Sequence, residues 1–399
     1  MKKFIVIFSL FILLPVSAQV PDEKEALKKF EKEQEEGMAK EEEAFRQYSA
    51  EVTKQYSDYL AEQERLFKEY TGAIGKKWGK KQVKTSTREE YVAYDAQYGS
   101  RRSVNFEEGK AKVEILMTEA EAKDPKKVQE KLKQQVAQLA VDKGGSDPLE
   151  KQTNVSPEKR PIVAGQLQTP DGKPVTERTA GQFAEQSVQP ALVTQQLVTG
   201  ADGLKRVIVG VQIPLVPDHV KKRATEFRGN VRSQATRFGI DVTLVFAIMH
   251  TESYFNPKAK SPVPAFGLMQ LVPKSGARDA FFFAHKKDSL VTGEYLFVAE
   301  NNIELGTAYL TKLLTVDFRG VTDIKSRMYC AISAYNTGPG NVAKAFTGKR
   351  NVTQALPKIN AMTSDEVFAH LRKNLPFEET RTYIVKVSER MGMYSEWSE

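Results

Sequence analysis

The sequence predicts an α+β fold, in which an N-terminal α+β domain precedes an α-rich domain. The chain has 399 residues, more than one typical domain holds, and 40% of them are hydrophobic, which is enough for two cores. Short segments with strand-like alternation occur between residues 91 and 116 and again at 207–214. After Pro217 most segments have helical periodicity instead.

The first 18 residues have the pattern of a secretory signal peptide. Residues 2–3 are basic, residues 4–14 are apolar but too few to span a bilayer as a helix, and residues 16–18 form a small-residue cleavage site. We therefore expect a mature chain that starts at Gln19 and is exported to the periplasm, with an uncleaved anchor as the alternative. No other segment is long and apolar enough to predict a stable membrane span.

A long helix is predicted at the start of the mature chain. Residues 22–43 are dense in charge, which indicates a solvated helix or a partly disordered segment. Between residues 45 and 70 aromatic and aliphatic side chains recur every three to four positions, which is typical of a helix. We interpret this stripe as core packing. The alternative is a face that binds a protein partner or a second copy of the chain.

The rest of the N-terminal domain reads as a sheet with one helix. Residues 91–94, 103–106 and 110–116 are predicted strands, and the Glu-Glu-Gly segment between the last two indicates a hairpin turn. Residues 125–143 predict a helix, the glycine- and proline-rich stretch at about 144–174 predicts an exposed loop, and 207–214 predicts a strand that completes the sheet. These patterns place the N-terminal domain at 19–215 and the second domain at 216–399.

Charge and composition narrow the classes of partner and cofactor. The net charge of +8 suits an anionic partner. No nucleic-acid recognition motif is present, so we expect the protein not to bind nucleic acid. Cys330 is the single cysteine and lies in an apolar run, which predicts a core residue and no internal disulfide. The four histidines lack metal-ligand spacing, so we expect neither a metal nor a cofactor.

Glu252 ends a short apolar helix that Asp241 is predicted to cap. Four apolar residues lie three, four, seven and eight positions before it: Met249, Ile248, Val245 and Leu244. This spacing places the carboxyl on the apolar face of the helix, where desolvation raises its pKa toward neutrality and prepares it to act as an acid. The alternative is an ordinary solvated glutamate at a fraying helix end. The Asn256-Pro257 step is expected to stop the helix.

Several short motifs follow Glu252 in the sequence and bear on the role of its carboxyl. In order they are Ser261, Gly267-Leu268-Met269-Gln270, Asn302-Ile303-Glu304, Ala334-Tyr335-Asn336, Gly338-Pro339-Gly340 and Glu379-Thr380-Arg381-Thr382-Tyr383. In this order they resemble the SLT-type lytic transglycosylases, which cleave the glycan strands of peptidoglycan. Residues 281–297 and the N-terminal stretch 98–114 are most similar to the membrane-bound lytic murein transglycosylase C branch.

The resemblance implies a lysozyme-like fold for residues 216–399 and a reaction without water. One glutamate, here Glu252, serves first as acid and then as base, while the C6 hydroxyl of N-acetylmuramic acid attacks C1 and forms a 1,6-anhydro ring. The partner is then the peptidoglycan glycan strand.

The resemblance also implies a set of substrate-binding residues. Ser261 would orient a carboxyl or a sugar hydroxyl, Met269 would touch a sugar face, and Gln270 would bind acetamido groups. Tyr335 and Asn336 would line the groove, and the phenol of Tyr383 would reach the acid. Glu304 fits a structural role better, and Glu379 and Arg381 fit a surface ion pair.

Two departures from the family pattern limit what carries over. The branch usually has a lipid-attachment cysteine near the signal peptide, and none is present here, which predicts a soluble periplasmic protein and not a lipoprotein. Val263 occupies the place where the family often has a second serine.

Two other functions stay open at this point. A hydrolytic muramidase of goose-lysozyme type would need a second carboxylate to activate water, and Asp279, Asp288 or Glu294 in the 281–297 neighbourhood are the candidates. In a different class, the N-terminal domain of a wall-binding scaffold would carry the function, and cleavage would be residual.

Overall fold

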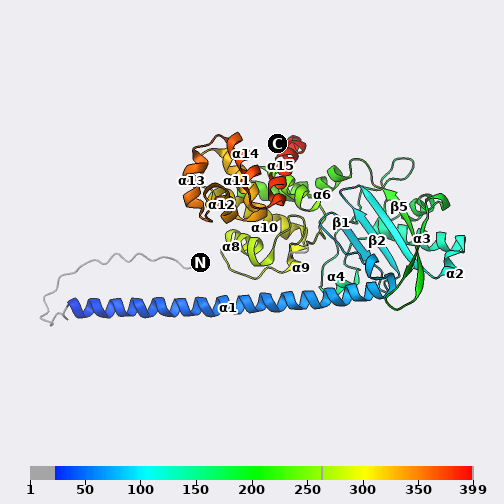
Figure 1. Ribbon diagram of the computed structural model, residues 1–399, viewed down its shortest axis with the longest axis horizontal. Coiled ribbons are helices and arrows are strands. Elements are labelled where there is room, and N and C mark those ends of the chain that lie inside the picture. Colours follow the sequence, from blue (N-terminus) through cyan, green and yellow to red (C-terminus); the bar gives the residue numbers. More distant parts are fainter. Residues whose placement is uncertain (1–22, 262–263, 398–399) are drawn as a thin grey trace. The chain divides into compact units, whose positions relative to one another are not determined.

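The computed structural model describes residues 23–261 and 264–397 (Figure 1). The predicted signal peptide, Gln19 and Val263 lie outside the described residues. The chain divides into two compact units, the first ending at Tyr59 and the second beginning at Leu60. In the part of the chain that the structure describes, no helix combines the length and the apolar character needed to cross a membrane.

Helix α1 (Glu23–Trp78) is 56 residues long and contains the predicted charged run. Residues 23–43 of that run are therefore helical, and the side chains of residues 27–43 are exposed. Tyr70, the last residue of the aromatic stripe, is 3% exposed and lies in one core with Ile74 and Trp78 of the same helix and Val92 of the sheet. Our interpretation of the stripe as core packing is confirmed for this end of α1.

A five-stranded antiparallel sheet follows, with the order β1-β2-β3-β5-β4. Its strands are β1 (Glu90–Tyr94), β2 (Ser100–Asn105), β3 (Lys110–Met117), β4 (Thr194–Thr199) and β5 (Lys205–Pro214). The four predicted strands are confirmed, and β5 completes the sheet as expected: it pairs with β3, with Val113 opposite Val211. Strand β4 was not predicted, because it is a mostly exposed edge strand without apolar alternation.

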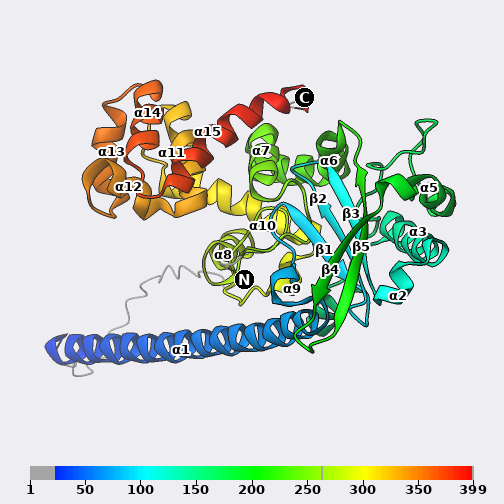
Figure 2. The same cartoon turned by 45° about the vertical axis from the view of Figure 1, so that its right-hand side comes forward.

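One face of the sheet is covered by helices (Figure 2). Helix α3 (Pro125–Val141) begins at the N-cap Asp124 and buries Val128, Leu132 and Val136 in the same core as Val113 and other strand residues. The short helices α2 (Glu119–Ala122) and α5 (Ala180–Ser187) accompany α3. Helix α4 (Pro148–Gln152) instead packs Leu149 against the core formed by Tyr70, Ile74 and Trp78. The 3₁₀ turns in this part of the chain are η1 (Lys80–Gln82) and η2 (Pro190–Leu192).

The prediction of an exposed loop at about 144–174 is wrong over much of this stretch. It contains α4, and Val155, Ile162, Val163 and Leu167 are at most 5% exposed. Glycine and proline shape the turns of this segment, but its apolar side chains supply part of the core beside the sheet.

Residues 219–397 form the helical region, and the lysozyme-like α-rich fold that we expected is observed there. The helices are α6 (His219–Phe238), α7 (Val242–Ser253), α8 (Arg278–His285), α9 (Gly293–Leu296), α10 (Ala299–Lys312), α11 (Ile324–Thr337), α12 (Pro339–Thr347), α13 (Val352–Asn360), α14 (Ser364–Asn374) and α15 (Glu378–Met393), with short turns η3 (Pro273–Ala277), η4 (Leu313–Asp317) and η5 (Ser395–Trp397). The helical periodicity expected after Pro217 is confirmed, and the predicted apolar helix that carries Glu252 is α7. Cys330 of α11 is fully buried, as a core residue should be.

Residues 60–218, here called the sheet region, pack directly against the helical region within the second unit. The buried guanidinium of Arg223 in α6 donates to the carbonyl of Ile162 at 2.9 Å and lies 3.5 Å from the ring centroid of Phe106. Tyr254, just after α7, donates its hydroxyl to Glu107 at 2.7 Å. We propose 215/216 as the domain boundary; the polar and aromatic contacts across it hold the two regions together.

Candidate active site

Local capping and backbone geometry place Glu252 at the end of α7. The Asp241 carboxylate accepts from the Thr243 N–H at 2.8 Å, so the predicted N-cap is confirmed. The helix stops because Tyr254 and Phe255 adopt left-handed conformations with φ of 49° and 59°. Arg223 donates to the carbonyls of both residues, which holds this unusual pair of conformations in place.

The Glu252 carboxyl is buried and hydrogen-bonded. It is 5% exposed, and the Tyr383 hydroxyl of α15 donates to its Oε1 at 2.7 Å. Burial raises the pKa of Glu252 to about 7; the positive charge of Arg88 and the Tyr383 hydrogen bond oppose this rise, and the negative charge of Glu379 adds to it. A carboxyl with this pKa can both donate and accept a proton near neutral pH. Sequence reasoning predicted this pair of residues, and the structure brings them together.

The Gly267–Gln270 segment is a tight turn built on Asn302 of α10. The Asn302 side chain accepts from the Met269 N–H at 2.7 Å and donates to the carbonyls of Phe266 and Leu296, both at 2.8 Å. Gly267 has φ of 75°, and a Cβ there would lie 2.4 Å from the Leu296 carbonyl oxygen and from the Asn302 amide. The glycine therefore permits close approach to the protein's own chain.

Met269 is not placed to touch a sugar, which corrects the prediction. Its side chain is fully buried and packs so closely on Gly306 that a Cβ on that glycine would lie 2.2 Å from the Met269 sulfur. The Met269 carbonyl instead accepts from the Tyr335 hydroxyl at 2.8 Å. Tyr335 thus braces the turn, while its ring lies near enough to Glu252 for that carboxylate's charge to raise the pKa of the phenol, after the larger effect of burial.

Within the described part of the chain, the Gln270 side chain is hydrogen-bonded to the protein through its nitrogen but not through its oxygen. Its Nε2 donates to the carbonyls of Ala259 and Gly267 at 3.1 and 3.0 Å. Its Oε1 is buried and accepts from no group among the described residues. An acceptor held in this way suits an amide N–H donor, such as the N–H of an acetamido group.

Ser261 and Asn336 are the remaining predicted binding residues. Ser261 is 7% exposed, and its N–H donates to the Ala265 carbonyl at 3.2 Å. Asn336 lies in the last turn of α11, and its Oδ1 accepts from the Thr380 hydroxyl of α15 at 2.6 Å. Asn336 is thereby oriented beside the same helix that carries Tyr383.

Arg88 was not identified from the sequence, and Glu379, the residue that Arg88 contacts, was predicted to pair with Arg381 instead. The predicted ion pair between Glu379 and Arg381 is wrong: Arg381 donates to the Leu375 carbonyl at 2.6 Å. Glu379 instead accepts from both terminal nitrogens of Arg88 at 3.0 Å, although the two residues are 291 positions apart in the chain. No local pattern around Arg88 could have indicated this contact. Glu304 has the structural role predicted for it, paired with Arg237 of α6.

The candidate second carboxylates in the 279–294 segment are each engaged elsewhere. Asp279 pairs with Lys312 at 3.6 Å, Asp288 accepts from Arg278 at 2.7 Å, and Glu294 accepts from Gln63 at 3.2 Å. The carboxylate that does act electrostatically on Glu252 is Glu379.

A cavity of about 410 Å³ lies beside Tyr383, between the sheet region and the helical region. Its lining residues are Arg88, Glu89, Glu107, Thr251, Tyr254, Glu378, Glu379, Thr382, Tyr383 and Lys386. All of them are polar or charged, so the cavity offers hydrogen-bond donors and acceptors to a ligand.

Comparison with known proteins gives matches along most of the chain. The SLT transglycosylase domain model matches residues 229–356, and the model of the N-terminal domain of membrane-bound lytic murein transglycosylase C matches residues 38–226. The membrane-bound lytic murein transglycosylase C of Cronobacter sakazakii is 35% identical over 319 residues, which cover 79% of this chain and 85% of the relative. The protein of the same name from Yersinia pestis is 34% identical and covers 83% of this chain and 89% of the relative.

Among solved structures, the 70 kDa soluble lytic transglycosylase of Escherichia coli is 27% identical, with a TM-score of 0.34. That match covers 45% of this chain and 26% of the solved chain, so it spans about a quarter of the larger protein.

Proposed function

This chain belongs to the membrane-bound lytic murein transglycosylase C family, and on that premise we propose that it cleaves the β-1,4 bond between N-acetylmuramic acid and N-acetylglucosamine and leaves 1,6-anhydro-muramic ends. It is an enzyme, a peptidoglycan lyase. The observation that carries the proposal is Glu252: one buried carboxyl, hydrogen-bonded by Tyr383, with a pKa of about 7.

The reaction needs one proton donor that then becomes a proton acceptor. In the first step protonated Glu252 gives its proton to the glycosidic oxygen, and the bond from C1 to that oxygen breaks. The acetamido oxygen of the muramic acid stabilises the positive charge left at C1. In the second step the Glu252 carboxylate takes the proton of the C6 hydroxyl while that oxygen bonds to C1, so the carboxyl ends as it began.

Burial suits both steps. At neutral pH a pKa near 7 leaves a large fraction of Glu252 protonated and ready to donate. Burial and the charge of Glu252 raise the pKa of Tyr383 well above its usual range, so the phenol keeps its proton and donates to the carboxylate that forms after the first step. We assign the acceptor Oε1 of Gln270 and the oriented amide of Asn336 to the acetamido groups, and Ser261 to the same groove.

We further propose that the protein acts in the bacterial envelope, where peptidoglycan lies. Its net charge of +8 favours a substrate whose peptide stems carry carboxylates. The partner face suggested for residues 45–70 stays a prediction.

Product analysis tests the function. Purified sacculi are incubated with the wild type or with Glu252→Gln, and the released muropeptides are analysed by mass spectrometry. We expect anhydro-muramyl ends from the wild type and none from the variant. Reducing ends from the wild type would instead identify a hydrolase, and an absence of products from the wild type would refute the enzymatic proposal.

Removal of the Tyr383 hydroxyl should slow the reaction and move its pH dependence. That hydrogen bond stabilises the ionised form of Glu252, so Tyr383→Phe raises the Glu252 pKa and shifts the alkaline limb of kcat/KM to higher pH. We expect a rate about tenfold to a hundredfold lower, since a bond to a charged group is lost.

A matched variant controls for general damage to α7. Tyr394→Phe removes another buried hydroxyl, which contacts the His250 side chain of the same helix at 2.9 Å. Its alkaline limb should stay where the wild type has it. A Tyr383→Phe limb that also stays in place would contradict the role of the phenol.

A further inference from the structure

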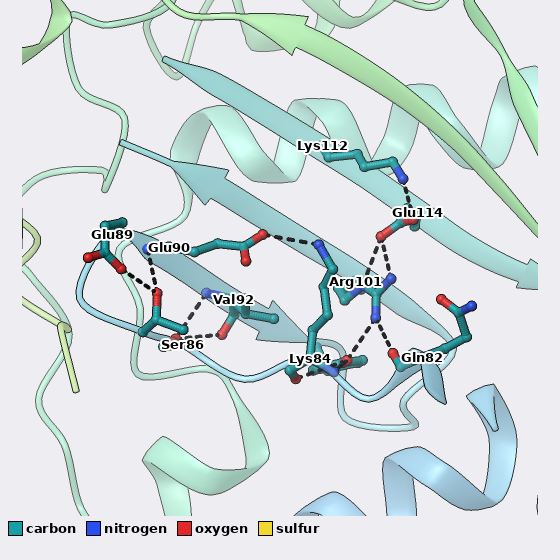
Figure 3. A network of polar contacts seen from close by, with 11 residues as sticks. Gln82, Lys84, Ser86, Glu89, Glu90, Val92, Arg101, Lys112 and Glu114 are labelled. Atoms are coloured by element: carbon teal, nitrogen blue, oxygen red, sulfur yellow. Dashed lines mark hydrogen bonds and ion pairs between the residues drawn. The ribbon is translucent and has the colours of Figure 1, made fainter. Parts of the chain in front are cut away.

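Residues 83–89, here called the arginine loop, connect η1 to β1 and are fixed to the sheet by their own hydrogen bonds (Figure 3). The Tyr94 hydroxyl accepts from the Lys84 N–H and donates to the Lys84 carbonyl, both at 3.2 Å. The Ser86 hydroxyl likewise accepts from the Val92 N–H at 3.0 Å and donates to its carbonyl at 3.2 Å. The loop therefore runs along β1 as an irregular extra strand held by side chains.

The base of the arginine loop rests on a buried charge network (Figure 3). Arg101 of β2 is 1% exposed, donates to Glu114 of β3 at 2.6 and 2.8 Å, and also donates to the Gln82 carbonyl at 2.6 Å. Lys112 adds a second cation to Glu114 at 2.7 Å. Buried and fully paired groups of this kind hold one geometry, so the loop leaves the sheet from a fixed point.

The tip of the arginine loop reaches the helical region at two places. The Thr87 carbonyl accepts from the Lys260 N–H at 3.4 Å, next to the Ser261 segment. Arg88 donates two hydrogen bonds to Glu379 of α15, one turn before Tyr383. The loop thus brings a cation of the sheet region into the cavity lined by Tyr383, whose hydroxyl donates to Glu252.

We propose that Arg88 is a positioning residue for the reaction, which stabilises the Glu252 carboxylate formed when the glycosidic bond breaks, and that Glu379 moderates this effect. The inference rests on the proposed function and deepens it, because it assigns part of the catalytic machinery to the sheet region. The first step creates a negative charge in a buried site, and a fixed cation nearby lowers the free energy of that charge.

The charged and titratable groups around Glu252 come from helices α11 and α15 and from the arginine loop. Tyr383 and Glu379 face it from α15, Tyr335 from α11 and Arg88 from the arginine loop. Further charges that line the adjoining cavity are Glu89, Glu107, Glu378 and Lys386. Of the charged groups, Arg88 lowers the Glu252 pKa and Glu379 raises it, so their removal has opposite consequences.

Three variants of the full-length chain test the inference through the pH dependence of kcat/KM. Arg88→Gln should move the alkaline limb to higher pH by about one unit and lower the rate at the optimum about tenfold. Glu379→Gln should move the limb to lower pH, since it removes a negative charge and frees Arg88. The double variant should have a limb close to that of the wild type, and Arg88→Lys should keep the limb because it keeps the charge.

A second arginine–glutamate pair supplies the control. Arg237→Gln breaks the Arg237–Glu304 ion pair on the far helices α6 and α10, and it should leave the limb in place. Limbs that do not move, or that move in the same direction for Arg88→Gln and Glu379→Gln, would overturn the inference. If Arg88→Gln fails to fold, Glu379→Gln still decides, because its side chain is 60% exposed and its loss leaves the core intact.

The same assays separate this inference from the proposed function. A wild type that forms no anhydro ends refutes the function itself. A wild type that forms them, together with limbs that stay in place in the Arg88 and Glu379 variants, refutes the inference alone.

Discussion

Replacement of Glu252 by glutamine is expected to lower the rate of muropeptide release about a thousandfold or more. Glutamine has nearly the same shape and can still accept from Tyr383, but it can neither give nor take the proton that both steps require. The measurement is the initial rate of release from purified sacculi at the optimal pH of the wild type. Because the change is nearly isosteric, the loss cannot come from altered packing.

Glu304→Gln is the matched control for this result. Glu304 is a partly buried glutamate in the same region, and its contacts with Arg237 and His285 are structural. We expect its rate to stay within a few-fold of the wild type. A Glu252→Gln enzyme that retained a tenth of the wild-type rate would show that another group supplies the proton.

The same substitution should increase stability at alkaline pH. The folded state holds the pKa of Glu252 at about 7, above its ordinary value of 4.5, so the folded protein binds more protons than the unfolded chain between these values. The stability contributed by the protonated carboxyl is fully present below pH 4.5 and is lost as the pH rises through 7. Above pH 7 Glu252→Gln should therefore be more stable by roughly 3 kcal/mol, and near pH 4 the difference should vanish in urea denaturation.

The second large effect concerns Asn302, whose replacement by alanine should reduce the free energy of unfolding by about 3–5 kcal/mol. The side chain is fully buried and makes three hydrogen bonds to the backbone of Phe266, Met269 and Leu296. Alanine leaves three buried polar groups without partners, each at a cost of about 1–3 kcal/mol before relaxation. Urea denaturation monitored by circular dichroism measures the difference.

The neighbouring Asn301 provides a control of the same chemistry. Its amide is only partly buried and makes a single bond of 3.3 Å to the Tyr295 carbonyl. Asn301→Ala should cost about 1 kcal/mol or less. If the two variants are equally stable, the Gly267–Gln270 turn is held by something other than the Asn302 amide.

Local features of the chain were predictable from the sequence. The cap at Asp241, the apolar run of α7 and the position of Glu252 on it are set by neighbours within a few residues. The hairpin between β2 and β3 follows from alternation and a turn signal for the same reason. The contact between Glu252 and Tyr383 is different: it was predicted only through the family resemblance, because it joins residues 131 positions apart.

The features that were missed depend on distant contacts or on the direction of a side chain. The sequence around Met269 does not reveal that its side chain turns toward Gly306 and away from the cleft. Arg88 gains its significance only when the arginine loop meets α15. The Glu379–Arg381 pair could have been rejected from the sequence, since residues two apart on a helix face different directions.

The central claim is that Glu252 acts alone and that the sugar's own hydroxyl replaces water as nucleophile. The most direct test is to digest sacculi in water enriched in oxygen-18 and to measure the isotope in the new chain ends by mass spectrometry. We predict anhydro ends that contain none of the heavy isotope, because no water is consumed. Reducing ends that carry oxygen-18 at C1 would contradict the claim, since they require a hydrolytic mechanism with a second carboxylate.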